Sequence, residues 1–159
     1  MSTSALASST KVGDVVATLP VDGFRRAAGW MTLVRDVIGE RPDAIGDLRL
    51  LKWQLEEAAN EVLEPGPDPL LVAQLWYGLR GEDPTPPHQV GMKLGYSRER
   101  IRRVHQRLIH RLGYPRYSRS IRAGFFSYPP DADRYGREAL LEWKRVWAPR
   151  DLTSDARWE

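Results

Sequence analysis

The sequence of 159 residues contains no cysteine, which excludes disulfide bonds, thiolate zinc sites and cysteine nucleophiles. Its only histidines are His88, His105 and His110, whose spacing does not predict a zinc site. No apolar run reaches the length of about 18 residues that a membrane span needs. Residues 1–20 also lack the apolar core of a signal peptide. We therefore expect a soluble, cytoplasmic protein that uses no cofactor and contacts no membrane.

The short motifs that carry catalysis are also absent from the sequence. It has no recognisable nucleophile–base pair, paired-carboxylate motif or glycine-rich phosphate loop. The composition, 42% hydrophobic and 28% charged, is typical of one small globular domain or two very small ones. A binding protein is expected rather than an enzyme.

Charge is strongly segregated along the chain, although the net charge is only +3. Residues 1–90 carry 8 basic and 13 acidic side chains, a net charge of −5, and residues 123–159 carry 6 and 7, a net charge of −1. Residues 91–122 carry 10 basic side chains and 1 acidic one, a net charge of +9. Such a basic block indicates a polyanionic partner, most often nucleic acid, and the alternative is a solvated arginine-rich helix.

Apolar residues recur at helical spacing along most of the chain, and no series of strands is predicted, so we expect an all-α fold. Predicted helices cover 24–38, 43–62 (opened by Pro42-Asp43), 70–79, 87–94, 98–112 and 133–147. An Arg/aromatic segment without a predicted helix extends from 116 to 130. We divide the chain into a flexible N-terminus (1–20), N-terminal helices (21–64), a helix-turn-helix region (70–115) and a C-terminal extension (116–159).

The helices predicted at 87–94 and 98–112 are separated only by Gly95-Tyr96-Ser97, and the second is strongly basic. This arrangement is typical of a helix-turn-helix. The absence of a side chain at Gly91 allows close approach, and Gly95 suits a turn that needs a positive φ. The expected core contacts of this unit come from Val90, Leu94, Tyr96, Ile101 and Val104.

A helical wheel of residues 98–112 separates an apolar stripe from a polar side. The stripe holds Ile101, Val104, Leu108 and Leu112, whereas Glu99, Arg102, Arg103, Gln106 and His110 cluster opposite, with Arg98 at the edge. Arginine can pair with guanine and glutamate with the cytosine amino group, so the predicted base-reading residues are Arg98, Glu99, Arg102 and Arg103. The predicted contacts to the DNA backbone are Ser97, Arg100, Gln106, Arg107, Arg111, Arg116 and Arg119.

Two stretches resemble region 4 of the primary sigma-70 factors of bacterial RNA polymerase. They are the run from Leu75 to Leu79 and the run from Val90 to Val104, with Ser97-Arg98-Glu99-Arg100-Ile101-Arg102 as the most specific part. The resemblance implies that the second helix enters the major groove of the promoter −35 element. It also implies that Arg98 and Glu99 read bases, that Arg102 and the residue at 103 contact the site, and that one surface binds the polymerase β-flap.

The sequence departs from that family in three respects. Position 103 is Arg where the family usually has Gln, and prolines at 84, 86 and 87 replace the usual helix start. The resemblance covers only about residues 70–115, and residues 1–64 lack the DNA-melting region 2. The chain therefore resembles a stand-alone region 4 that works with RNA polymerase or with a separate sigma-like partner, in a bacterium or a phage.

The leading hypothesis is a sequence-specific, double-stranded DNA-binding transcription regulator. One alternative is a helix-turn-helix repressor or phage DNA-binding protein that is independent of polymerase, and another is an interaction module for an acidic protein. His105 is expected at the edge of the core, and His88 and His110 on the surface. Phe125 and Phe126 are expected to pack on the core. The tryptophans at 143, 147 and 158 fit either core closure or a partner surface.

Overall fold

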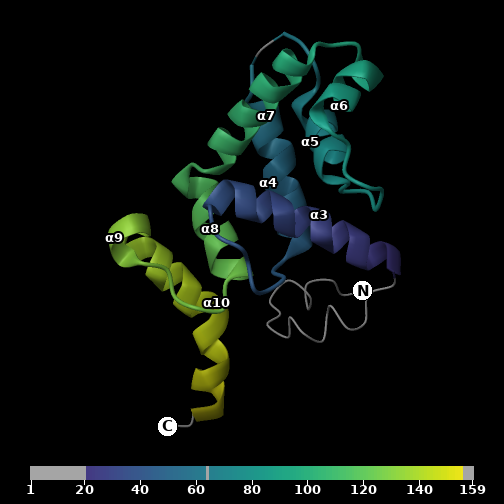
Figure 1. Cartoon of the computed structure of the whole chain (residues 1–159). Helices are drawn as coiled ribbons and strands as arrows, with labels where there is room; N and C mark the ends of the chain where they lie inside the picture. Colours follow the sequence, from purple (N-terminus) through teal and green to yellow (C-terminus); the bar gives the residue numbers. More distant parts are fainter. Residues whose placement is uncertain (1–20, 64, 156–159) are drawn as a thin grey trace.

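The computed structural model describes residues 21–63 and 65–155, which are helical throughout their regular structure, as the sequence predicts (Figure 1). The expected flexible N-terminus, residues 1–20, and Trp158 lie outside the described residues. The helices are α3 (Val21–Ile38), α4 (Leu48–Asn60), α5 (Pro69–Tyr77), α6 (Pro87–Leu94), α7 (Arg98–Leu112), α8 (Pro115–Phe125), α9 (Ala132–Tyr135) and α10 (Arg137–Asp155). None of these helices has the length and apolarity needed to cross a membrane.

Helix α4 begins later than the Pro42-Asp43 step predicted. Its N-cap is Asp47, whose carboxylate accepts hydrogen bonds from the backbone N–H groups of Arg49 and Leu50 at 3.0 and 3.1 Å. The predicted start was wrong because Asp43 has a distant partner instead: its carboxylate accepts a hydrogen bond from the backbone N–H of Ser127 at 2.8 Å. The segment before α4 is thereby attached to the chain that follows α8.

The segment 116–130, for which no helix was predicted, is helical in its first part, which belongs to α8. Pro115 occupies the first turn, where its missing N–H costs nothing, and Tyr117, Ile121 and Phe125 follow at intervals of four residues and are buried. The expected packing of Phe125 and Phe126 on the core is confirmed. The interleaved arginines obscured this helical period in the sequence.

Arg122, on the same helix, is almost completely buried, with 2% of its surface exposed. Its guanidinium donates to the backbone carbonyls of Tyr128 and Pro129 at 3.0 and 3.2 Å and lies over the rings of Phe126 and Tyr128. It therefore holds the loop after α8 and is inaccessible to phosphate, unlike Arg116 and Arg119 of the same helix, which are at least partly exposed.

The predicted C-terminal helix is divided in two at Gly136, which has a φ of +91° and separates α9 from α10. The indole N–H of Trp143 donates to the carbonyl of Phe126 at 3.0 Å, and that of Trp147 donates to the carbonyl of Ala123 at 2.7 Å. Both tryptophans thus fasten α10 to the end of α8, which favours core closure for these two side chains.

Two apolar clusters hold the helices together. The larger one draws on α3, α4, α5, α7 and α8, and includes Leu33, Leu55, Tyr77, Leu108 and Ile121. The smaller one joins α5, α6 and α7 through Val72, Val90, Ile101 and Val104. Because α7 contributes to both clusters, it connects the upper part of the molecule in Figure 1 to the helices below it.

The turn between α6 and α7 depends on two glycines, as expected. Gly95 ends α6 with a φ of +83°, and the N–H groups of Gly95 and Tyr96 both donate to the carbonyl of Gly91 at 2.7 and 2.9 Å. A Cβ atom on Gly91 would lie 2.4 Å from the carbonyl oxygen of Tyr96. The prediction that the Tyr96 side chain is a core contact was wrong. This side chain is 37% exposed and lies beside Arg100 instead.

We predict that Gly91→Ala lowers the free energy of unfolding by about 1–3 kcal/mol, the usual cost of overpacking a rigid contact. The added methyl group would collide with backbone, which cannot rotate away as a side chain can. Chemical denaturation followed by circular dichroism measures the change. The matched control is Gly124→Ala on α8, where a Cβ meets only an ordinary contact at 3.8 Å, so its stability should equal or exceed that of the native chain. Equal stabilities of the two variants would contradict the close approach.

Candidate nucleic-acid interface

The orientation of α7 about its own axis is set by its apolar stripe. Ile101, Val104, Leu108 and Leu112 are all at most 2% exposed, so the stripe predicted from the helical wheel is confirmed. Ser97 starts the helix as predicted: its Oγ accepts a hydrogen bond from the N–H of Arg100 at 3.1 Å. Burial of one side of the helix leaves the opposite side in solvent.

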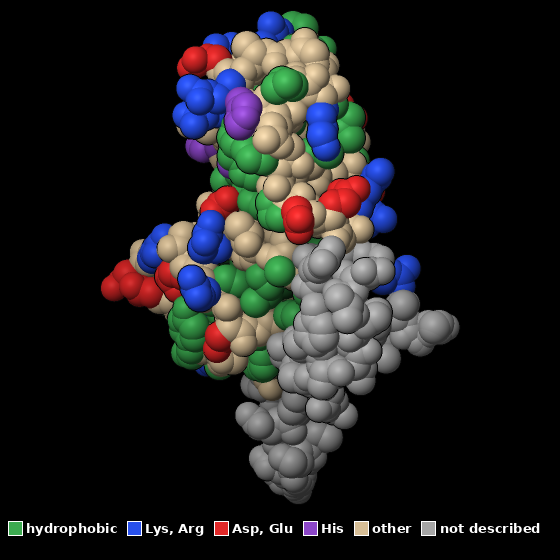
Figure 2. Space-filling model, turned by 45° about the vertical axis from the view of Figure 1, so that its right-hand side comes forward, with side chains coloured by type: hydrophobic (Ala, Val, Ile, Leu, Met, Phe, Trp, Pro, Cys, Tyr) green, Lys and Arg blue, Asp and Glu red, His purple; other side chains and the backbone are tan. Residues whose placement is uncertain are grey.

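The opposite side of α7 carries the predicted base-reading residues together. Arg98, Glu99, Arg102, Arg103, Gln106, Arg107 and His110 are all exposed. Among the described residues, the side chains of Arg98, Arg102 and Arg103 make no hydrogen bond or ion pair. Figure 2 shows Lys and Arg side chains along the outer edge of the upper part of the molecule. This exposed side, hereafter the α7 face, therefore presents three guanidinium groups, those of Arg98, Arg102 and Arg103, that are not engaged within the described structure.

Arg100 differs from its neighbours, because its guanidinium is turned toward the loop between α4 and α5. It donates a hydrogen bond to the backbone carbonyl of Pro65 at 2.6 Å and lies 5.9 Å from the centre of the Tyr96 ring. This contact ties the first turn of α7 to the proline-rich loop. The structure thus places Arg100 beside the α7 face rather than on it.

The remaining predicted backbone contacts are held in ion pairs. Glu61, just after α4, pairs with both Arg111, at 3.8 Å, and Arg116. Arg119 of α8 pairs with Glu138 of α10 at 3.1 Å. The structure therefore does not bring all the predicted contacts onto one surface: Arg111 and Arg116 flank the far end of the α7 face, and Arg119 lies toward α10.

A hollow of about 410 Å³ adjoins the α7 face at that end. Its lining includes Gln106, Arg107 and Arg111 from α7, together with Glu61 and Leu63 after α4. The Leu63 side chain is 87% exposed. The end of α4 and the second half of α7 thus form one continuous surface of mixed charge.

A partly buried chain of hydrogen bonds holds the side of α7 that faces α3 and α5. The hydroxyl of Tyr77 donates to the Asp36 carboxylate at 2.6 Å, and Nε2 of His105 lies 2.6 Å from the same hydroxyl oxygen. Because the hydroxyl has one hydrogen, Nε2 must be the donor to it. The His105 ring also stacks on Trp76, with centroids 3.7 Å apart and planes within 5°. This confirms His105 at the edge of the core and links α3, α5 and α7.

Burial is the largest cause of the pKa shifts of His105 and Tyr77. It lowers the pKa of His105 from 6.5 to about 4, although the charge of Asp36 acts in the opposite direction. Burial, together with the hydrogen bond to Asp36, also raises the pKa of the Tyr77 hydroxyl. His105 is therefore neutral at pH 7.

His88 and His110 are exposed, as predicted. In the part of the chain that the structure describes, no three or more histidine, aspartate or glutamate side chains gather closely enough to hold a metal ion. The chemistry available at the α7 face is hydrogen bonding from guanidinium and amide groups. That is suited to recognising an anionic or base-edge surface.

The sequence did not predict the roles of two sets of residues around α7. Asp36 and Tyr77 support α7 from elements distant in sequence, through hydrogen bonds that end at His105. The sequence places Glu61 on the polar side of an amphipathic, acidic stretch, which is typical of a solvated carboxylate. In the structure, Glu61 pairs with Arg111 and Arg116. Long-range pairing of this kind leaves no local pattern in a single sequence.

We predict that the free energy of unfolding falls as the pH is lowered from about 6.5 to about 4. The folded-state pKa of His105 lies below its unfolded value, so in this window the unfolded chain binds the additional proton. His105 contributes less than about 1.4 kcal/mol per pH unit to this slope, the limit for one group. Urea denaturation at a series of pH values measures it. His105→Gln should reduce the slope in this window, whereas the exposed control His88→Gln should leave it unchanged. An unaltered slope in His105→Gln would rule out this assignment.

Comparisons with known proteins add no assignment to this geometry. No family model, curated protein or solved structure matches the chain. The function is therefore inferred from the residues and their arrangement.

Proposed function

We propose that this protein is a DNA-binding transcription regulator that inserts the α7 face into the major groove and acts with or on bacterial RNA polymerase at promoters. The observation that carries the proposal is the set of exposed side chains Arg98, Glu99, Arg102 and Arg103 on one side of a helix whose other side is fully buried. No catalytic step is part of this function.

The dimensions of α7 suit this role. An α-helix with its side chains is about 10–12 Å across, and the major groove is about 12 Å wide. Arg98, Arg102 and Arg103 each offer a fork of donors for guanine, and Glu99 offers an acceptor for a cytosine amino group. Ser97, at the start of α7, adds exposed backbone and hydroxyl groups close to a helix N-terminus, which favours a phosphate oxygen.

The basic residues at the far end of α7 act on the DNA backbone in this proposal. Gln106 and Arg107 extend the α7 face, and Arg111 and Arg116 flank it beside Glu61. Such contacts orient the protein without reading sequence. Because Glu61 competes with phosphate for two of these arginines, affinity for nonspecific DNA is moderated.

The link to RNA polymerase is supported by the resemblance of residues 70–115 to region 4 of primary sigma-70 factors. The run from Ser97 to Arg102 is the strongest part of it, and it coincides with the first turn of the exposed α7 face. In this proposal the promoter −35 element is the DNA target, and Arg103, where that family usually has Gln, alters the preferred base at one position.

Selection from random double-stranded DNA, followed by binding measurements on the selected site, tests the proposal. We expect Arg98→Ala and Arg102→Ala each to lose about 1–3 kcal/mol of binding and to relax preference at one base position. The matched control is Arg137→Ala on α10, an exposed arginine outside the α7 face. Selection of the same site with native affinity by both α7 variants, or no selection by the native chain, would exclude base reading by α7.

Neutralising Glu61 gives an independent prediction for the backbone contacts. Glu61→Gln should tighten binding to DNA of any sequence and steepen its salt dependence, because Arg111 and Arg116 become available to phosphate. Titrations at several salt concentrations measure both effects. The control Glu142→Gln removes a carboxylate paired with Arg145 on α10 and should change neither quantity. Weaker or unchanged binding by Glu61→Gln would argue against phosphate contacts at this end of α7.

A pull-down from bacterial extract after nuclease treatment separates the polymerase role from DNA binding alone. Retention of RNA polymerase without DNA is the expected result. Its loss, with site-specific DNA binding intact, would favour a repressor or phage protein independent of polymerase. Retention of an acidic protein, with no DNA binding, would favour an interaction module.

A further inference from the structure

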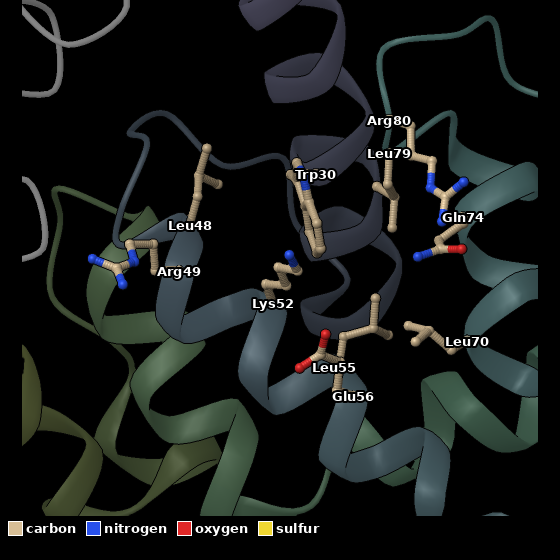
Figure 3. Close-up of a pocket in the computed structure, with 10 residues that line it drawn as sticks. All are labelled: Trp30, Leu48, Arg49, Lys52, Leu55, Glu56, Leu70, Gln74, Leu79 and Arg80. Atoms are coloured by element: carbon tan, nitrogen blue, oxygen red, sulfur yellow. The ribbon is translucent and has the colours of Figure 1, made fainter. Parts of the chain in front are cut away.

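A groove of about 720 Å³ opens between α3, α4 and α5 (Figure 3). The ten lining residues shown there come from these helices and from Leu79 and Arg80, which follow α5. None of them belongs to α6 or α7. The groove is therefore separate from the α7 face, and the proposed function does not use it.

The inner surface of the groove is apolar. Trp30, Leu55 and Leu79 lie deepest, at 8%, 1% and 5% exposure, and belong to the larger core cluster. Leu48 on α4 and Leu70 on α5 pack against that cluster and are only partly buried. The groove thus offers apolar contacts, and its floor is formed by side chains that are part of the larger core cluster.

The rim of the groove is basic. Lys52 and Arg80 are exposed and make no ion pair among the described residues, and Arg49 lies at the same rim. Among the described residues that line the groove, Glu56 is the one acidic side chain. This excess of positive charge is unusual for its surroundings, because residues 1–90 carry a net charge of −5, yet three of their 8 basic side chains meet here.

The groove has the dimensions of a short helix. Along α4 it extends from Leu48 to Glu56, nine residues that at about 1.5 Å per residue span about 13 Å, or between two and three helical turns. A partner helix of that length places apolar side chains at positions i, i+3 or i+4 and i+7 along one side. Its flanks then lie opposite the basic rim, where carboxylates are favoured.

We propose that this groove binds an acidic amphipathic helix of a partner protein. The apolar side of that helix contacts Leu48, Leu70 and the Trp30 edge, and its carboxylates pair with Lys52 and Arg80. Affinity comes from apolar burial, and the charges select an acidic partner over a basic one.

The test uses the full chain and a designed, fluorescently labelled peptide of about 14 residues, long enough as a helix to span the groove, with Leu on one side and Glu elsewhere. Anisotropy measures binding, and the indole signal of Trp30 in nuclear magnetic resonance spectra reports where the peptide lies. One control peptide has the same composition with Leu spread around the helix, and another has Lys in place of Glu. We expect the acidic amphipathic peptide to bind at least tenfold more tightly than either, and added salt to weaken it.

The charge-reversal variant Lys52→Glu/Arg80→Glu should bind the acidic peptide at least tenfold more weakly and gain affinity for the Lys peptide. The matched control is Lys144→Glu/Arg137→Glu on α10, which changes the same charge on exposed residues outside the groove. Equal loss in both variants would mean nonspecific attraction and overturn the proposal, as would binding that leaves the Trp30 signal unmoved.

Two other occupants have distinct outcomes that also overturn the proposal. Concentration-dependent self-association that Lys52→Glu/Arg80→Glu alters would assign the groove to a second copy of the chain. A tenfold gain in peptide affinity after Val15→Ser/Val16→Ser would assign it to the chain's own residues 1–20. DNA binding of the same variants is measured in parallel. Because the groove shares no residue with the α7 face, we expect Lys52→Glu/Arg80→Glu to bind DNA with native affinity, so that failure of the groove proposal can be distinguished from failure of the proposed function.

Discussion

Burial of the apolar stripe of α7 is the constraint on which the rest of the structure depends. Leu108 and Leu112 enter the larger core cluster, and Ile101 and Val104 enter the smaller one, so four surrounding helices hold α7. A helix buried along one side cannot rotate without exposing large apolar groups. The hydrogen-bonded chain of Asp36, Tyr77 and His105 adds a directional restraint at the centre of that contact. Together they determine which arginines face the solvent.

Seven of the ten basic side chains in residues 91–122 fall into three groups with different surroundings. Arg98, Arg102 and Arg103 are exposed on α7 and pair with nothing among the described residues. Arg111 and Arg116 are paired with Glu61, just after α4, and Arg119 is paired with Glu138 of α10. Arg122 is buried and holds backbone carbonyls of the loop after α8. These side chains of the basic block are thus divided among exposed arginines without an ion pair, arginines held in ion pairs, and one buried arginine. Of these three groups, only the first can contact a polyanion without breaking an interaction within the described structure.

The two proposed surfaces lie on different elements, so the two proposals are compatible with binding of DNA and of a partner helix at the same time. The α7 face belongs to the basic part of the chain, whereas the groove between α3, α4 and α5 is built largely from its acidic part. Three of the basic residues in that acidic part, Arg49, Lys52 and Arg80, line this groove. Because the two surfaces share no residue, each can be altered by substitution without changing the other.

The sequence by itself determined the all-helical fold, the buried stripe of α7, its exposed arginines, and the glycines of the turn before it, because these follow from helical periodicity and backbone sterics within a few residues. It misplaced the start of α4 and missed α8, since Asp43 has a partner 84 residues away and arginines interrupt the apolar period of α8. Only the tertiary structure decided that Arg122 is buried, that Glu61 pairs with Arg111 and Arg116, and that a basic-rimmed groove lies beside Trp30. These features join residues far apart along the chain, and their energies depend on distance and burial, which local patterns do not encode.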